Sequence, residues 1–271
     1  MDNHHLAPVE GEPIHGICVD ADGTKAHEDM FRITKNEEGI LQLDIAVVVP
    51  PLKIVPLDKL QASLNDLLVN ESRQPRLFLN LETRTRYGFN STFPRRALVV
   101  TYVIDRHEEI LLEEVMISQA VGKRMRSYTE YDNSADANEI LSDLRRVLRT
   151  KPGIVSYVEE ILANNRPDSD SPGYQTTFIA TQLFNSTCRV SARSIGVNTP
   201  FIRRPHKVRG DHYFLLNDGL AKFNSPLRDP CALVNTSNLV SHCEGEIIPP
   251  FTEEFLRERI PLITTYKKQP G

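Results

Sequence analysis

The sequence of 271 residues predicts an α+β fold, in which a mixed β-sheet is flanked by helices within a single core. Strand-like stretches dominate the first part of the chain and helical stretches the second, a segregation typical of α+β domains. A chain of this length can bury a sizeable core, and its composition is ordinary for a globular protein, 40% hydrophobic and 25% charged. We therefore expect a flexible leader at residues 1–13 and one domain over residues 14–271.

Composition also limits the location and the partners of the protein. No apolar run of 18 residues occurs, so we expect no transmembrane helix, and the polar N-terminus has no signal-peptide core. The four cysteines are far apart, which favours free thiols in a reducing cytoplasm over a disulfide framework or a zinc site. Because the net charge is −4, contacts with nucleic acid must come from a local basic patch.

The first strand-like stretch, residues 14–19, leads into an acidic loop, and strand-like alternation returns at residues 30–33. Gly23 predicts a turn within this loop, because glycine adopts positive φ without steric cost. Crowded carboxylates repel one another unless a cation neutralises them, and oxygen clusters suit Mg²⁺ or Mn²⁺. The loop therefore predicts a magnesium or manganese site, with a solvated acidic loop as the alternative. The predicted ligands are Asp20, Asp22, Glu28 and Asp29.

The next elements follow from the spacing of apolar residues. The β-branched run at 39–49 predicts a strand buried on both faces, and the leucines of 57–69 have helical spacing. Residues 93–105 and 109–117 predict the two strands of a hairpin. The remaining helices are predicted at 137–150, 154–164, 175–195 and 252–266. The evidence is either apolar residues at helical spacing or apolar residues that lie between helix start and stop signals.

Two basic segments are candidates for contact with nucleic acid. Lys123 and Arg126 precede Tyr128, so cations that can bind phosphates stand beside a ring that can stack on a base. A solvated turn with a half-buried tyrosine is the alternative. The second segment is the strongest basic cluster in the chain, and the alternative is a plain surface patch. Its predicted RNA contacts are Arg203, Arg204 and His206.

The acidic loop resembles the first signature of the RNB family, the catalytic domain of ribonucleases II and R. That pattern runs I-D-P-P-G-T-K-D-x-D-D-A. Asp20 matches its first Asp and Asp29 its last, with Gly-Thr-Lys between them. Two residues depart from the pattern, since Ala26 stands in place of the second Asp and Glu28 in place of the third.

Later segments continue the resemblance in the family's order. Residues 43–48 are similar to the block V-H-I-A-D-V, although the His has become Asp44 and the Asp has become Val47. Residues 95–105 are similar to the block R-x-A-L-S-x-x-x-x-x-D. Tyr128 matches the tyrosine of an L-S-Y triplet that lies by the 3′ end of the RNA in the family. The segment around Arg204 is similar to G-x-P-x-x-x-R-x-H.

Residues 221–239 resemble the closing signature, A-x-F-T-S-P-L-R-R-Y-x-D-L-V-N-H-R-x-L. Arg228 matches the first Arg of its L-R-R triplet. Asp229, Pro230 and Ala232 replace the second Arg, the Tyr and the Asp. The family's last catalytic Glu has no assignable counterpart here. We also expect no flanking RNA-binding barrels, so that a protein partner could supply extra grip on RNA.

The resemblance implies a 3′→5′ exoribonuclease that hydrolyses single-stranded RNA with a divalent metal, Mg²⁺ or Mn²⁺. In that hypothesis Asp20, Glu28, Asp29 and Arg228 are catalytic. Asp22, which is absent from the family pattern, could replace the ligand lost at Ala26, and so could His27, whose imidazole suits Mn²⁺ better than Mg²⁺. We expect slow cleavage, because the substitutions affect positions that are catalytic in the family. Two alternatives remain. One is an RNA-binding pseudonuclease that has kept the RNA-binding groove and no longer hydrolyses RNA. The other is a structural or partner-binding domain.

Overall fold

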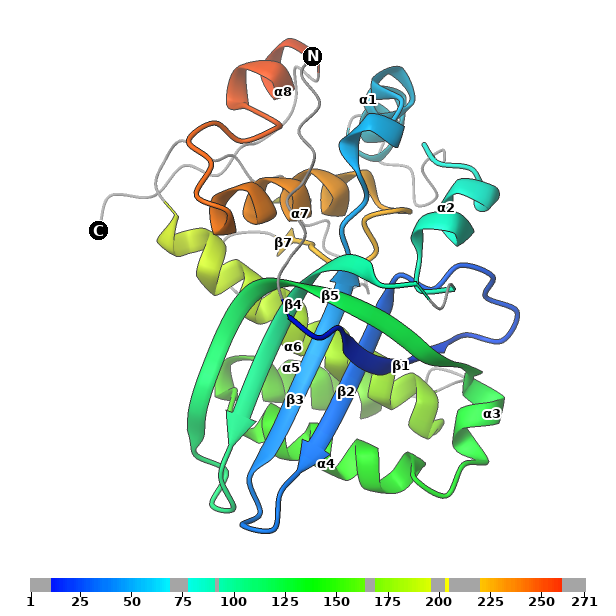
Figure 1. Cartoon of the computed structure of the whole chain (residues 1–271), viewed down its shortest axis with the longest axis vertical. Coiled ribbons are helices and arrows are strands. Elements are labelled where there is room, and N and C mark those ends of the chain that lie inside the picture. Colours follow the sequence, from blue (N-terminus) through cyan, green and yellow to red (C-terminus); the bar gives the residue numbers. More distant parts are fainter. Residues whose placement is uncertain are drawn as a thin grey trace.

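The computed structural model describes residues 11–68, 78–90, 93–163, 169–195, 203–204 and 220–259. Its centre is a closed five-stranded barrel (Figure 1). Neighbouring strands are antiparallel except β1 and β5, whose parallel pairing closes the barrel. The strands are β1 (Ile14–Asp20), β2 (Asp29–Lys35), β3 (Leu41–Val48), β4 (Arg95–Ile104) and β5 (Ile110–Ser127).

The central strands are buried on both faces, as the β-branched run predicted. In β3, Leu43, Ile45 and Val47 pack in one hydrophobic cluster, whereas Ala46 and Val48 pack in another. This division follows from the geometry of a strand, in which successive side chains point to opposite faces. The barrel wall therefore separates two cores, and each core needs its own set of helices to cover it.

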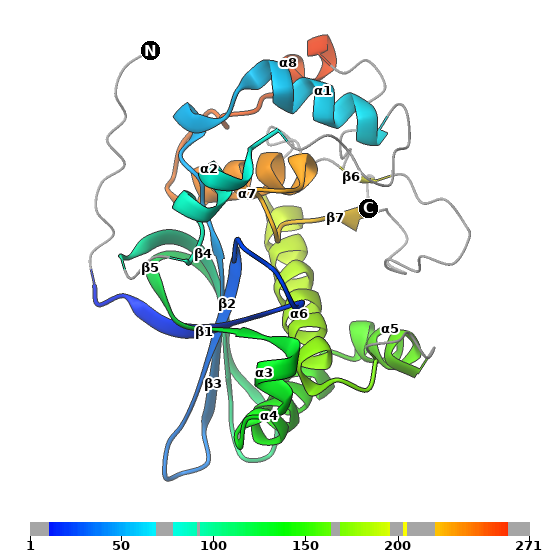
Figure 2. The ribbon, with the colours of Figure 1, turned by 90° about the vertical axis from the view of Figure 1, so that its right-hand side faces the viewer.

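The first core lies between the barrel and a layer of helices that includes the long helix α6 (Figure 2). Buried apolar residues from all four helices join it, among them Tyr131, Leu144 and Phe184. In α4 they recur at helical spacing on one face, which is the amphipathic pattern expected of a surface helix. The helices are α3 (Tyr128–Asp132), α4 (Ala137–Arg149), α5 (Pro152–Ala163) and α6 (Pro172–Ser194).

The second core extends from the other face of the barrel strands to a cap of helices at one end of the barrel (Figures 1 and 2). Leu60, Leu233 and Leu256 join it from three helices of this cap. The elements of the cap are η1 (Leu52–Ile54), α1 (Leu57–Leu68), α2 (Leu81–Tyr87), α7 (Pro230–Cys243) and α8 (Glu253–Arg259). A short two-stranded sheet leads into α7, formed by β6 (Arg203–Arg204) and β7 (Leu220–Ala221).

The α+β class and the mixed sheet are confirmed, and so are the long predicted helices. Three short or buried helices were not predicted, namely α2, α3 and α7, and β5 runs well beyond residue 117. The last predicted helix, 252–266, is seen as α8, and residues 260–271 lie outside the described part, as do residues 1–10 of the leader. No described helix is long and apolar enough to cross a membrane. The four cysteines are free.

Candidate functional site

The acidic loop is held in place by the segment that follows α2. Gly23 has φ +82° at the predicted turn, a conformation that favours glycine. Beyond the turn, the backbone N–H of His27 donates to Asn90 Oδ1 (2.9 Å), and the His27 carbonyl accepts from the N–H of Phe89 (2.8 Å). Asn90 Nδ2 also donates to the carbonyl of Lys25 (3.0 Å). These bonds fix the loop as it enters β2, and so they fix Glu28 and Asp29.

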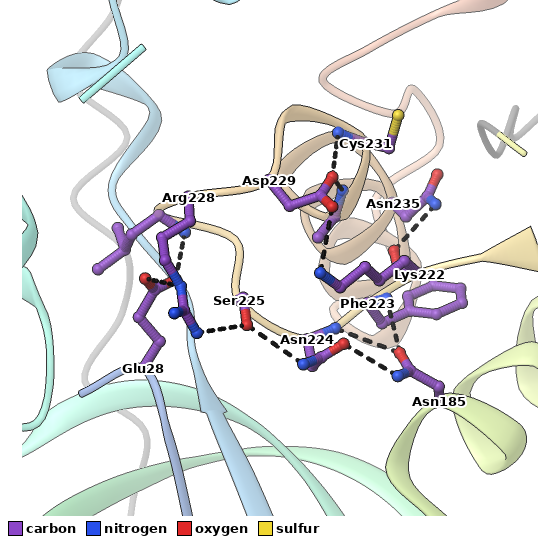
Figure 3. A network of polar contacts seen from close by, with 12 residues as sticks. Glu28, Asn185, Lys222, Phe223, Asn224, Ser225, Arg228, Asp229, Cys231 and Asn235 are labelled. Carbon is purple, nitrogen blue, oxygen red and sulfur yellow. Dashed lines mark hydrogen bonds and ion pairs between the residues drawn. The ribbon is translucent and has the colours of Figure 1, made fainter. Parts of the chain in front are cut away.

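The segment between β7 and α7 lies against α6 and is fixed by one buried amide (Figure 3). Asn185 Nδ2 donates to Asn224 Oδ1 (2.9 Å), and Asn185 Oδ1 accepts from the N–H of Phe223 (2.8 Å). On the other side, Thr236 Oγ1 of α7 donates to the carbonyl of Phe223 (2.6 Å). Residues 223–228 are thereby presented to the acidic loop between two helices.

The residues that depart from the closing signature have a structural role in α7. The side chain of Asp229 accepts from the N–H groups of Cys231 (2.9 Å) and Ala232 (3.1 Å), and Pro230 occupies the first turn. An acidic N-cap followed by proline is a favourable helix start. Lys222 Nζ lies 3.1 Å from the same carboxylate. The substitutions therefore begin a helix that is buried over most of its length.

Glu28 is sealed inside the protein by ion pairing (Figure 3). Its side chain is 0% exposed, and Oε2 accepts from the N–H of Leu227 (2.8 Å). Oε1 lies 2.9 Å from Arg228 Nε and 3.6 Å from Arg84 Nη2. Burial raises the pKa of Glu28 to about 7, against the opposing influence of the Arg228 charge. Oε2 of this predicted metal ligand is thus hydrogen-bonded within the chain, whereas Oε1 is ion-paired and makes no hydrogen bond.

Asp29 stands beside a strained residue. Ser225 has φ +63°, which is uncommon outside glycine, and its N–H and Oγ lie 3.4 and 3.5 Å from the Asp29 carboxylate oxygens. Arg228 Nη2 donates to Ser225 Oγ (3.0 Å). Burial raises the pKa of Asp29, Arg228 opposes that rise, and the charge of Asp20 adds to it. Strain of about 1–3 kcal/mol at such a position is typical of functional sites.

The other two predicted ligands have separate partners. Asp20 Oδ2 lies 2.7 Å from His27 Nδ1, so this carboxylate is hydrogen-bonded to an imidazole from the same loop. Asp22 turns away to α3, where it accepts from the N–H (3.2 Å) and Oγ1 (2.5 Å) of Thr129, and these bonds lower its pKa. Asp22 therefore stands apart from the other three carboxylates.

The charges of Asp20, Glu28 and Asp29 meet at one guanidinium. Burial opposes the charge of Arg228, but these three carboxylates, together with Asp229, raise its pKa. Among the described residues, no group of three or more His, Cys, Asp or Glu side chains is placed to hold a metal ion. The four predicted ligands, as arranged here, do not form a Mg²⁺ or Mn²⁺ site with three or more of these side chains. A metal at this position remains a prediction.

Tyr128 begins α3, directly after the strand that closes the barrel. Its ring meets Tyr174 of α6 edge-on, with centroids 6.1 Å apart, and Tyr174 stacks on Phe178 at 6.0 Å. Of the basic residues before it, Lys123 is exposed, whereas Arg126 pairs with Asp136 (3.1 Å). The predicted turn is therefore the end of a strand followed by a capped helix.

The second basic segment is described only in part. The backbones of Arg203 and Arg204 pair with those of Ala221 and Leu220 in the β6–β7 sheet, which brings this chain segment next to the start of the closing signature. His206 lies outside the described residues. The predicted RNA contacts of this segment stay predictions.

Sequence reasoning missed the partners that neutralise the acidic site. Arg84 lies on a short helix that was not predicted, and nothing in the local sequence points to Glu28 as its partner. Ser225 and Asn185 act through tertiary contacts, which have no local signal. The Asp229–Pro230 pair did carry a signal, since an N-cap residue before proline predicts a helix start.

Comparison with known proteins bears on the fold. No family model and no curated protein matches the chain. Among solved structures, an active-site mutant of the Dss1 exoribonuclease from Candida glabrata aligns with a TM-score of 0.61 and 10% identity, over 92% of this chain and 42% of that one. Yeast Ssd1, described as a pseudonuclease, aligns with a TM-score of 0.50 and 13% identity, over 71% and 28%. The chain thus spans less than half of each protein and has an RNB-like fold.

Proposed function

We propose that this protein is an RNA-binding pseudonuclease, which holds single-stranded RNA on an RNB-like fold and does not hydrolyse it. One observation carries the proposal: Glu28 and Arg228 form an ion pair in which the carboxylate is completely buried. In hydrolysis of a phosphodiester, carboxylates would hold the metal and an arginine would neutralise the phosphate. Two groups that neutralise each other are not free for either task.

The residues around this ion pair support the same conclusion. Ala26 offers no oxygen, and its side chain is buried. Asp22, the expected replacement for the ligand missing at Ala26, accepts a hydrogen bond from Thr129. Because Mg²⁺ requires near-ideal octahedral geometry, displacing one ligand costs orders of magnitude in rate. We therefore derive no catalytic step through a metal from this arrangement.

Two observations support RNA as the ligand. The fold is shared with one protein described as an exoribonuclease and another described as a pseudonuclease. Tyr128 is half-buried beside Tyr174, at the end of a strand that carries exposed cations, so a ring and phosphate-binding charges lie on one segment. Aromatic rings beside a basic surface are the usual means of holding a single strand.

A slow metal-dependent 3′→5′ exoribonuclease is the second candidate, favoured by the carboxylates that remain. Asp20 and Asp29 are close enough for the charge of Asp20 to raise the pKa of Asp29. Arg228 keeps a 38% exposed side chain beside them. In this candidate Asp20 and Asp29 would hold the metal, and it would supply Lewis-acid activation of the phosphate.

A binding and cleavage assay distinguishes the two candidates. A 5′-labelled single-stranded RNA is incubated with the protein in Mg²⁺, in Mn²⁺ or in chelator, and the bound fraction and product sizes are measured. We expect bound, uncut RNA under all three conditions, also with Ala26→Asp. A ladder of products that requires metal and disappears in Asp29→Asn would establish the exoribonuclease instead, and that variant also controls for contaminating nuclease.

The binding half of the proposal is tested at Tyr128. If a base stacks there, Tyr128→Ala should weaken a short oligonucleotide by about 1–3 kcal/mol. Tyr128→Phe is the matched control, because it keeps the ring and removes only the hydroxyl. Equal affinities for the wild type, the alanine variant and the phenylalanine variant would show that no base stacks at this ring. An absence of any RNA binding by the wild type would reject the proposed function itself.

A further inference from the structure

A groove with a volume of about 530 Å³ lies beside β1, β2, β5 and α4. None of the four predicted metal ligands lines it. Figure 1 shows that α4 lies at the end of the barrel opposite to α1 and α7. Charged side chains dominate its polar lining, which includes His15, Arg32, Lys35, Lys123, Arg124 and Asp136.

A β-bulge places two of these cations side by side. Along the parallel pair of β1 and β5, Gly16 faces Gly122 but the next residue, Ile17, faces Arg124. Lys123 is therefore an extra residue in β5. Consecutive side chains of a regular strand point to opposite faces, whereas a bulge redirects them. Lys123 and Arg124 accordingly are both exposed and both line the same groove.

Two glycines allow the backbone to pack closely at this bulge. A Cβ on Gly16 would lie 2.6 Å from the carbonyl oxygen of Phe31, and a Cβ on Gly122 would lie 2.9 Å from that of Phe89. Neither distance is compatible with a side chain unless the backbone shifts. The closure of the barrel and the placement of the two cations therefore depend on the same pair of glycines.

The acidic residues of the groove already have cationic partners. The ion pairs of its wall are Arg126–Asp136 (3.1 Å), Lys35–Glu139 (2.9 Å) and Lys35–Asp143 (2.7 Å). Arg32 in turn pairs with the buried Asp44 (2.6 Å). Within the part of the chain that the structure describes, Lys123 and Arg124 have no ion-pair partner. The groove thus has two adjacent, exposed cations that are not matched by the protein.

We propose that Lys123 and Arg124 bind phosphates of single-stranded RNA along this groove, an inference that rests on the proposed function and locates its binding surface. A guanidinium forms bidentate hydrogen bonds with phosphate, and an adjacent ammonium adds a second charge. RNA also carries ribose hydroxyls that can donate to the carboxylates of the wall. An acidic peptide has no such side-chain donors. Both cations lie within five residues of Tyr128, so one strand can reach the groove and the ring.

The test measures RNA affinity for wild type, Lys123→Ser, Arg124→Ser and the double variant over a range of salt concentrations. The double variant should bind about tenfold more weakly, with each single variant contributing a comparable part. Because each phosphate contact on a single strand contributes about 0.7 to the logarithmic salt slope, the double variant should reduce that slope by about 1.4. The matched control is Lys53→Ser with Lys59→Ser, which removes two exposed cations near the α1 end of the molecule.

Several outcomes would overturn the inference. Unchanged RNA affinity and salt slope in the double variant would show that RNA does not bind in this groove and binds elsewhere on the protein. An equal loss of RNA affinity in the control variant would show that the effect depends on net charge and not on the groove. A loss confined to one single variant would contradict the bulge geometry. A poly-glutamate peptide that binds as tightly as RNA would assign the groove to acidic peptides. No RNA binding by the wild type would reject the proposed function together with this inference.

Discussion

The acidic site and the groove beside α4 differ in how their charged side chains are placed: those of the acidic site are largely buried and ion-paired, and two cations of the groove are exposed. At the acidic site, Glu28 is 0% exposed and is neutralised by Arg228, with Arg84 close by. In the groove, Lys123 and Arg124 are exposed and have no ion-pair partner among the described residues. Buried charges must be compensated inside the protein, whereas hydrated ones need no such partner. The carboxylate at the site that should perform chemistry is buried and ion-paired, and the cations of the surface that should bind are exposed.

This difference locates the function of each region. An arginine that already neutralises a buried carboxylate contributes chiefly to folding, because breaking its ion pair costs stability. An exposed, unmatched cation contributes little to folding and remains available to a ligand. We therefore expect substitutions at the acidic site to change stability and substitutions in the groove to change RNA affinity.

The largest effect is expected at Glu28. Glu28→Ala removes one partner of a buried ion pair and leaves Arg228 and Arg84 uncompensated, which should lower the free energy of unfolding by about 3–5 kcal/mol. Lys123→Ser should stay within about 0.5 kcal/mol of the wild type, as is usual for surface positions. Urea denaturation of both variants measures this contrast. Equal stabilities of the two variants would remove the distinction between the regions.

The pH dependence of stability gives a second test. Burial raises the pKa of Glu28 to about 7 from an ordinary value of 4.5, so the folded state binds more protons than the unfolded state between these values. The free energy of unfolding should therefore fall as pH rises from 4.5 to 7, by up to about 3 kcal/mol. The raised pKa of Asp29 acts in the same direction, whereas the lowered pKa of Asp22 acts in the opposite direction and at lower pH.

Glu28→Gln identifies the group responsible. It keeps the volume of the side chain and can still accept from Leu227, but it cannot titrate. Its unfolding free energy should therefore vary much less over this pH range than that of the wild type. Thermal denaturation followed by circular dichroism at several pH values gives the comparison. A decline of the same steepness in this variant would assign the titration to another group.

The local parts of this architecture could be read from sequence, and the long-range parts could not. The β-branched run of residues 39–49 predicted a doubly buried strand, observed as β3 (Leu41–Val48), because its pattern is set by local burial. Closure of the barrel depends on Gly16 facing Gly122 across strands more than 100 residues apart in the chain. No spacing within either strand reveals this contact.

The same limit applies to the acidic site. The structure brings Leu227, Arg228 and Ser225 of the closing signature to Glu28 and Asp29 of the acidic loop. The sequence could not predict that Arg228 would pair with Glu28, because the direction of a side chain depends on its tertiary partners. Asp22 illustrates this too, since its partner Thr129 lies 107 residues away.

The smallest predicted effect concerns a charge on the groove wall. Asp136→Asn removes a partly exposed carboxylate that lines the groove and pairs with Arg126, so the potential of the groove becomes more positive. RNA affinity should rise about two- to threefold, and stability should change by less than about 1 kcal/mol because the pair is near the surface. The control is Glu160→Gln, which removes an equal charge from the exposed face of α5. Fluorescence anisotropy at low salt can resolve this gain. If the control strengthens binding as much as Asp136→Asn, the groove responds to net charge, and its local arrangement of charges does not determine affinity.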